Sequence, residues 1–250
     1  MTSSLLQALG SLRTAMVDEF CAALEFKAFT ELAYVFATQY TIPQVQSAPV
    51  TIGYSQFAGA TGLADRTFPA ADIHGHIRTA KERYFFSLIH QHQVALFEHN
   101  FFNLIRLLIE HEPRHLSGKR QLEYALVLNA KTREEIIALL IDREINEIKY
   151  KNVGEWFAYL ERLAFGISLP QGDIERIAEA KASRDILVHN AGIVNQTYVN
   201  KAGPAARFML GELLDVSGDY TRDTWTLFLN SLTQFADSLL ARFSPKSADA

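Results

Sequence analysis

Apolar residues recur at steps of three and four along two long stretches of this chain, and this spacing constrains its fold more than any other feature. In residues 4–40 the stripe includes Leu5, Leu9, Leu12, Met16, Phe20 and Leu24. In residues 76–111 it includes Phe86, His90, Val94, Phe97, Phe101, Leu104 and Leu108. An α-helix places such positions on one face, which must then be buried against a neighbour. The pattern predicts long helices packed side by side, and therefore an all-α fold.

Four further helices are expected downstream, over residues 132–150, 153–165, 173–189 and about 221–242. Thr132 and Glu135 have the spacing of a capping box, and Asp173 is expected to cap the third of these helices. The apolar face of the first is expected at Ile136, Leu139, Leu140 and Ile148. Residues 190–220 contain several glycines and predict a loop with a small β-hairpin around 208–217.

Residues 43–75 have a different composition, with seven glycine or proline positions among serines and threonines. A mostly irregular connection of this length is unusual within a compact domain, so it is either functional or a boundary. We therefore divide the chain into an N-terminal helical extension with its connection (1–75), a helical domain (76–242) and a frayed tail (243–250).

Composition excludes several classes of protein. Hydrophobic residues make up 48% of the 250 residues and charged residues 21%, which excludes a mostly disordered chain. The net charge of −4 does not indicate a general binder of nucleic acid or anionic membranes, although it is compatible with a local basic cleft. Cys21 is the single cysteine, expected to be a buried, inert thiol. No signal peptide and no membrane-spanning segment are predicted, which favours a cytoplasmic protein.

Residues 179–195, EAKASRDILVHNAGIVN, form the segment that stands out chemically. Arg184 and His189 are separated by four residues, and Asp185 follows the arginine. On an ideal helix the two side chains point about 140° apart, so they do not stack. They converge only if the helix ends at His189 or if a second subunit completes the site. Asn190 and Gly192 favour such an ending.

Ordinary structural roles remain open for these residues, because arginine and histidine occur at similar spacing twice more in the chain. Arg184 could form a surface ion pair with Glu179 or Asp185, and His189 could act as a C-terminal helix cap. Glu179 and Lys181 are expected to be solvated.

Other candidate residues have equally ordinary alternatives. Trp156, Phe157 and Tyr159 are expected to pack in the core rather than stack on bases. A further alternative is a metal site using the histidines of residues 90–115, in which His92 and His99 share a face.

The stretch ASRDILVHNAGIVNQTY resembles the signature of the HEPN superfamily, whose common pattern is Arg, a polar residue, a few apolar residues and then His. Residues 141–163 resemble the helix pair before this motif in larger HEPN proteins, such as those of the RiboL-PSP-HEPN or MAE type. The helix around Phe97 and Glu98 resembles their first core helix. The resemblance covers about residues 76–242 and implies an HEPN-type up-and-down helical bundle.

The resemblance also implies a function, that of a metal-independent endoribonuclease with a composite site in a homodimer. Arg184 would hold the scissile phosphate, and His189 would move the proton of the 2′-hydroxyl or protonate the leaving oxygen. The product would be a 2′,3′-cyclic phosphate, and neither metal nor cofactor is implied. Supporting roles would fall to Asp185, Asn190 and Glu179. Contacts to RNA would fall to Lys181, Tyr198 and Lys201.

The biological role implied is phage defence or toxin-like growth arrest, with an antitoxin or another regulatory partner. Toxin-type HEPN proteins often have a tyrosine two residues after the histidine, where this chain has Ala191. Modification of that tyrosine is therefore not implied here. The alternative function is a noncatalytic HEPN module that binds RNA or a partner protein.

Overall fold

The computed structural model describes residues 2–41, 49–52, 65–116 and 128–244. Its helices are α1 (Thr2–Phe36), α2 (Ile73–Thr79), α3 (Phe86–His111), α5 (Arg133–Lys149), α6 (Val153–Leu163), α7 (Gln171–His189), α8 (Gln196–Ala202) and α9 (Gly218–Phe243). Short 3-10 turns cover Ala70–Asp72, Pro113–His115 and Gly203–Ala205. The all-α prediction is confirmed, since the strands among these described residues are limited to β1 (Val50–Ile52) and β2 (Arg66–Phe68).

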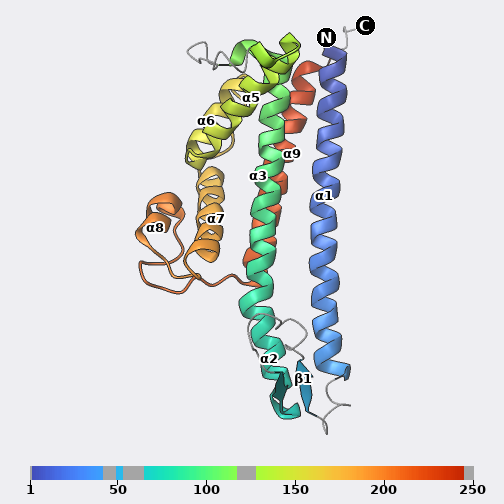
Figure 1. The fold of residues 1–250 in the computed structure, drawn as a ribbon, viewed down its shortest axis with the longest axis vertical. Helices are drawn as coiled ribbons and strands as arrows, with labels where there is room; N and C mark the ends of the chain where they lie inside the picture. Colours follow the sequence, from blue (N-terminus) through green and yellow to red (C-terminus); the bar gives the residue numbers. More distant parts are fainter. Residues whose placement is uncertain (1, 42–48, 53–64, 117–127, 245–250) are drawn as a thin grey trace.

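Three long helices form the body of the molecule (Figure 1). α1, α3 and α9 pack against one another along their lengths. The shorter helices α5, α6 and α7 pack on the side of α3 that faces away from α1, and α8 packs on α7. Both ends of the chain lie at the same end of this elongated bundle, opposite β1 and α2. The motif helix α7 is therefore on the flank of the bundle.

Aromatic rings in stacked and edge-to-face contact fill the main core between α3, α6 and α9. The ring centroids of Phe97 and Phe228 lie 4.5 Å apart, and those of Phe101 and Phe157 lie 5.0 Å apart. Trp156 packs on the same group and is buried, as is Phe157. The prediction that these α6 aromatics belong to the core is confirmed, and they fix α6 against α3.

The helix α1 belongs to this same core. Leu5, Leu9, Met16 and Phe20 are buried in one cluster with the aromatic residues of α3 and α9. Each contributes on the order of 1.5–3 kcal/mol of burial free energy. The apolar stripe predicted in residues 4–40 is thus confirmed, and the division at residue 75 does not divide the hydrophobic core.

The predicted helix over residues 76–111 begins earlier, at Ile73, and passes through a π-helical stretch, Ala80–Phe85. A second π-helical stretch, Ala37–Thr41, extends α1. Between these helices β1 and β2 pair antiparallel, with Val50 opposite Phe68, in a region predicted to be mostly irregular. The remainder of that connection, residues 42–48 and 53–64, lies outside the described residues. So do residues 245–250 of the predicted tail.

The buried face of α5 differs from the predicted one. Ile141, Ile145 and Ile148 are buried, whereas Leu139 is 37% exposed. Of the four predicted positions only Ile148 is fully buried, because the helix is turned so that its later isoleucines meet α3. Thr132 does cap this helix by accepting from the backbone N–H of Glu135 at 3.1 Å. The Glu135 carboxylate accepts from the backbone N–H of Lys131.

Three predictions around the motif helix are wrong. The N-cap of α7 is Pro170, and Asp173 lies inside the first turn. Within residues 190–220, predicted as a loop, α8 forms and is capped by the Asn195 side chain, which accepts from the backbone N–H of Tyr198. The hairpin expected around 208–217 is absent from these described residues. Instead Ile193 pairs antiparallel with Leu213, so the chain returns to the end of α7.

Candidate functional site

The motif helix α7 ends where the sequence predicted, directly after His189. The backbone N–H groups of Asn190 and Gly192 both donate to the carbonyl of Ile186, at 2.9 and 3.1 Å. Ala191 and Gly192 have φ values of 51° and 81°, the left-handed conformation that stops a helix. A side chain at Gly192 would also lie 3.4 Å from Leu213. This ending fixes His189 in the last turn.

The outer face of α7 has a connected group of charges, which we call the outer cluster: Lys181, Arg184, Asp185, Lys201 and Glu98 of α3. The Arg184 guanidinium donates to Asp185 Oδ1 at 3.1 Å and lies 4.0 Å from Glu98 Oε2. The Lys181 ammonium lies 3.0 Å from Glu98 Oε1 and 3.6 Å from Asp185 Oδ1. Lys201 of α8 donates to Asp185 Oδ2 at 3.0 Å. Three cations thus converge on two carboxylates.

Asp185 is the centre of the outer cluster. Its partial burial raises the pKa of the carboxyl group, but the positive charges of Lys181, Lys201 and Arg184 outweigh burial and hold the pKa below its usual value. The carboxylate is therefore ionised at neutral pH. It forms ion pairs with the arginine and with both lysines.

His189 and Asn190 have different surroundings. The His189 side chain is exposed at the end of α7 and forms no hydrogen bond with the described residues. The Asn190 side chain donates to the backbone carbonyl of Ile193 and so stabilises the turn after the helix. His189 is therefore accessible to a ligand, while the amide of Asn190 is engaged in a local contact.

Arg184 and His189 are both in regular helix, so the two side chains point about 140° apart. Their side chains diverge within one chain even though both are on the accessible part of α7. The helix does end at His189, which meets one of the two conditions for convergence, but both residues still lie within it.

Glu179 lies on the opposite, inner face of α7 and is 3% exposed. Its Oε1 accepts from Ser183 Oγ at 2.6 Å, Tyr198 OH at 2.9 Å and Arg207 Nε at 3.0 Å. Its Oε2 accepts from Tyr220 OH at 2.7 Å. We call these residues, with His90, the inner cluster. Three of these four hydrogen bonds attach α8, residue 207 and the start of α9 to the motif helix.

The inner cluster shifts the pKa values of its tyrosines and of His90. Burial and the charge of Glu179 raise the pKa of both Tyr198 and Tyr220, which stay protonated and donate. Burial lowers the pKa of His90 to about 4, so this histidine is neutral. Its Nε2 lies 2.8 Å from the carbonyl oxygen of Ala180. A carbonyl can only accept a hydrogen bond, so the single ring hydrogen of the neutral histidine is on Nε2. The Arg207 guanidinium lies over the Tyr220 ring, 3.5 Å from its centroid.

The structure separates the predicted site residues into these two clusters. Arg184, Asp185, Lys181 and Lys201 are together on the outer face, with His189 at its end. The prediction that Glu179 is solvated is wrong, because it is buried. Tyr198 was predicted to lie in a loop and to contact RNA. It lies in α8, is 1% exposed and donates a hydrogen bond to Glu179.

Several residues of both clusters were not singled out from the sequence. Arg207 and Tyr220 lie 28 and 41 positions after Glu179, so no local spacing indicates their contact. Glu98 was noted only as part of a helix. The one local signal was the spacing of Ser183, four residues after Glu179. Residues at this spacing share a helix face, and the two side chains form a hydrogen bond.

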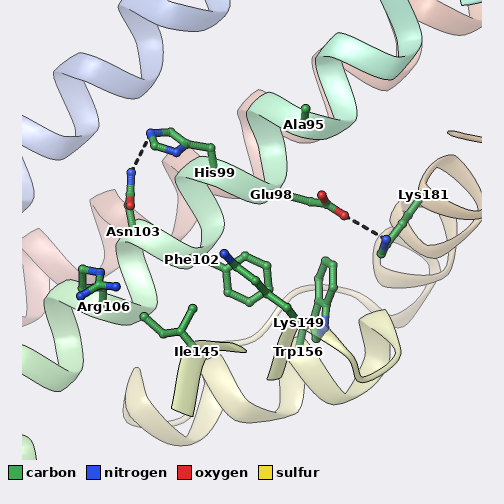
Figure 2. Close-up of a pocket in the computed structure, with 10 residues that line it drawn as sticks. All are labelled: Ala95, Glu98, His99, Phe102, Asn103, Arg106, Ile145, Lys149, Trp156 and Lys181. Carbon is green, nitrogen blue, oxygen red and sulfur yellow. Dashed lines mark hydrogen bonds and ion pairs between the residues drawn. The ribbon is translucent and has the colours of Figure 1, made fainter. Parts of the chain in front are cut away.

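A hollow of about 400 Å³ adjoins the outer cluster between α3, α5, α6 and α7 (Figure 2). The ion pair between Glu98 and Lys181 closes one side of it, and the Lys149 ammonium lies over the ring of Phe102, 5.2 Å from its centroid. On the other side His99 hydrogen-bonds Asn103 at 2.9 Å. The hollow places Lys149 and Lys181 on one surface.

The other sites weighed from the sequence have little support. The described residues contain no group of three or more His, Cys, Asp or Glu side chains placed to hold a metal ion. Cys21 is exposed, which corrects the prediction of a buried thiol.

None of the described helices combines the length and apolar character needed to cross a membrane.

A scan against protein-family models and searches of curated proteins and of solved structures all returned no match.

Proposed function

We propose that this protein is a metal-independent endoribonuclease of the HEPN type, acting as a homodimer in phage defence or toxin-like growth arrest. The observation that supports it most is the accessible outer face of α7, where Arg184 is held by Asp185 and His189 ends the helix without a protein partner in the described residues. These are the two side-chain types that RNA transesterification needs, a phosphate-binding cation and a group that can accept and donate a proton.

In the proposed reaction the 2′-oxygen of RNA attacks the adjacent phosphorus and the 5′-oxygen of the next nucleotide leaves. His189 of one protomer removes the 2′-hydroxyl proton and then, as the imidazolium, donates it to the leaving oxygen. Arg184 stabilises the charge that develops on the phosphate oxygens. Asp185 orients Arg184. The bonds balance without an external reactant and yield a 2′,3′-cyclic phosphate and a 5′-hydroxyl.

The divergence of Arg184 and His189 within one helix supports the dimeric part of the proposal. A two-fold axis beside α7 would place the Arg184 of one copy near the His189 of the other, as in an isologous interface. Exposed apolar side chains surround the helix end and would be covered there: Val188, Ile193, Met209, Leu210 and Leu213.

The test is cleavage of a set of purified RNAs in excess EDTA by the parent protein, His189→Ala and His74→Ala. His74 lies in α2 against α1, away from α7, and provides the matched control. We expect the parent and His74→Ala to cut and leave cyclic-phosphate ends. His189→Ala should lose about 10²–10⁴-fold in rate, as general acid–base catalysis typically contributes. Equal cleavage by His189→Ala and the parent would refute the mechanism.

A second candidate function, a noncatalytic module that binds RNA or a partner protein, is favoured by the acidic surroundings of Arg184. Asp185 and Glu98 both lie within 4.0 Å of the guanidinium and compete with a phosphate. Expression in a host cell separates the two functions. A nuclease slows growth and His189→Ala relieves the effect, whereas a binding module is equally harmless in both forms.

A further inference from the structure

We propose that a groove at the junction of α5, α6, α7 and α8 binds a single-stranded polynucleotide, with lysines on its phosphates and Tyr150 stacked on a base. The groove has a volume of about 360 Å³. The residues that define this lysine groove are Lys149, Tyr150, Lys151, Lys181 and Lys201. The inference concerns binding, and it goes beyond the proposed cleavage because it stands whether or not the chain cuts RNA.

The lysine groove has uncompensated positive charge on two of its four lysines. Among its described lining residues are four lysines and no carboxylate. Lys181 and Lys201 are each in contact with Asp185, at 3.6 and 3.0 Å. Lys149 and Lys151 are exposed and form no ion pair with any described residue. Uncompensated positive charge of this kind attracts phosphate groups, and each contact releases counterions.

The ring of Tyr150 identifies which phosphate compound fits. Its side chain is 93% exposed, the highest value among the large hydrophobic residues that the structure describes. A free phosphate or polyphosphate has no ring that could stack on an aromatic side chain, whereas a nucleotide has a flat base next to each phosphate. Alternating aromatic rings and cations are the usual means of holding single strands without sequence preference.

The turn that presents Tyr150 is well fixed. The backbone N–H of Lys151 donates to the carbonyl of Ile148 at 2.9 Å. Asn152 then caps α6, exchanging hydrogen bonds with Glu155 in a complete capping box. Because the backbone on both sides is held, little conformational entropy is lost when a base stacks on the ring.

The lysine groove leads to the outer cluster. Lys181 and Lys201 line the groove, and both contact Asp185, the neighbour of Arg184 in α7. Lys149 and Lys181 also line the hollow of Figure 2, so positive side chains continue around the α5–α6 corner. A strand held in the groove would thus pass directly to Arg184.

The experiment measures binding of a fluorescent 2′-O-methyl oligouridine of about twelve nucleotides, within the usual site size for single strands. The 2′-O-methyl group blocks transesterification, so the measurement is independent of cleavage. Inorganic polyphosphate serves as a competitor that has phosphates but no bases. Fluorescence anisotropy is recorded with the full-length protein over a series of salt concentrations.

Two pairs of variants test the lysines and the ring separately. K149Q/K151Q is matched by K131Q/R133Q, which removes the same charge at the other end of the 17-residue helix α5. We expect K149Q/K151Q to bind about tenfold more weakly and to flatten the slope of log K against log salt by about 1.4, while its control keeps the parental slope. Tyr150→Ala should weaken binding roughly fivefold or more without changing the slope.

The remaining controls decide whether stacking is the cause. Tyr150→Phe keeps the ring and should bind as the parent does. Tyr84→Ala removes an exposed tyrosine elsewhere and should have no effect. The proposal is overturned if K149Q/K151Q and K131Q/R133Q behave alike. It is also overturned if Tyr150→Ala binds the oligonucleotide like the parent, since the groove would then be a site for polyanions alone.

Discussion

The two faces of α7 contain polar clusters of similar size in opposite environments. On the inner face the Glu179 carboxylate is buried and accepts four hydrogen bonds from groups on α7, α8, α9 and the segment before α9. On the outer face Asp185 accepts from three cations that are still partly exposed. A buried, fully bonded carboxylate stabilises one arrangement, whereas exposed charges can exchange their partners for a ligand.

The difference shows how one helix can serve both stability and function. The inner cluster fixes α8 and residue 207 on α7, and this places Lys201 next to Asp185. The outer cluster is thereby preorganised by contacts to a buried carboxylate. Substitutions on the two faces should therefore have effects of different kinds.

The largest effect on stability is expected from Glu179→Ala. The change leaves the hydroxyl groups of Tyr198 and Tyr220 and the Arg207 guanidinium without their acceptor, at a cost of roughly 3–5 kcal/mol in free energy of unfolding. Glu175→Ala, in the same helix, is the matched control, because the Glu175 carboxylate accepts one hydrogen bond, from Gln171, among the described residues. It should stay within about 0.5 kcal/mol of the parent. Urea unfolding measures both. A loss below about 1 kcal/mol for Glu179→Ala would remove the distinction between the faces.

A smaller, pH-dependent effect is expected from His90. Its pKa of about 4 in the folded protein is below the unfolded value of about 6.5, so the unfolded state binds more protons in this interval. The stabilisation is full above about pH 6.5 and falls by roughly 3 kcal/mol as the pH drops to about 4.

His90→Gln tests this effect, because the glutamine amide can still donate to the carbonyl of Ala180 but does not titrate. Urea unfolding at several pH values should give a variant whose stability falls less steeply than that of the parent between about pH 6.5 and 4. Parallel curves for the two proteins would show that His90 does not titrate in this way.

The sequence predicted the long helices well because their apolar stripes are local patterns. The stripe from Phe86 to Leu108 is buried throughout, and the end of α7 at His189 followed from Asn190 and Gly192. The face of α5 was missed because Leu139 and Ile141 are equally apolar, and only the packing against α3 decides between them.

Only the outer cluster of the candidate site could be predicted from the sequence, because its residues on α7 form a local pattern and those of the inner cluster do not. The outer residues Lys181, Arg184 and Asp185 are close in sequence, so the motif identified them. The inner role of Glu179 depends on Arg207 and Tyr220, which tertiary structure brings to it. The helix α8 was missed since the glycines of residues 190–220 outweighed the capping signal of Asn195.

The smallest effect on stability is expected from substitutions on the outer face. Arg184→Gln and His189→Ala should each change the free energy of unfolding by no more than about 1 kcal/mol, because exposed ion pairs contribute little. Thermal and urea unfolding of the two variants check this. A larger loss would place Arg184 or His189 in the structural group with Glu179.

The most direct measurement uses the same two variants in a mixing experiment. Arg184→Gln and His189→Ala proteins are assayed for RNA cleavage in EDTA, each alone and after being mixed under conditions that exchange subunits. If Arg184 of one copy acts with His189 of the other, each variant alone is inactive and the mixture recovers about a quarter of the parental activity, since half of the dimers have one intact pair. Either variant cutting at the parental rate on its own, or a mixture that stays inactive, would contradict a site shared between two copies of α7.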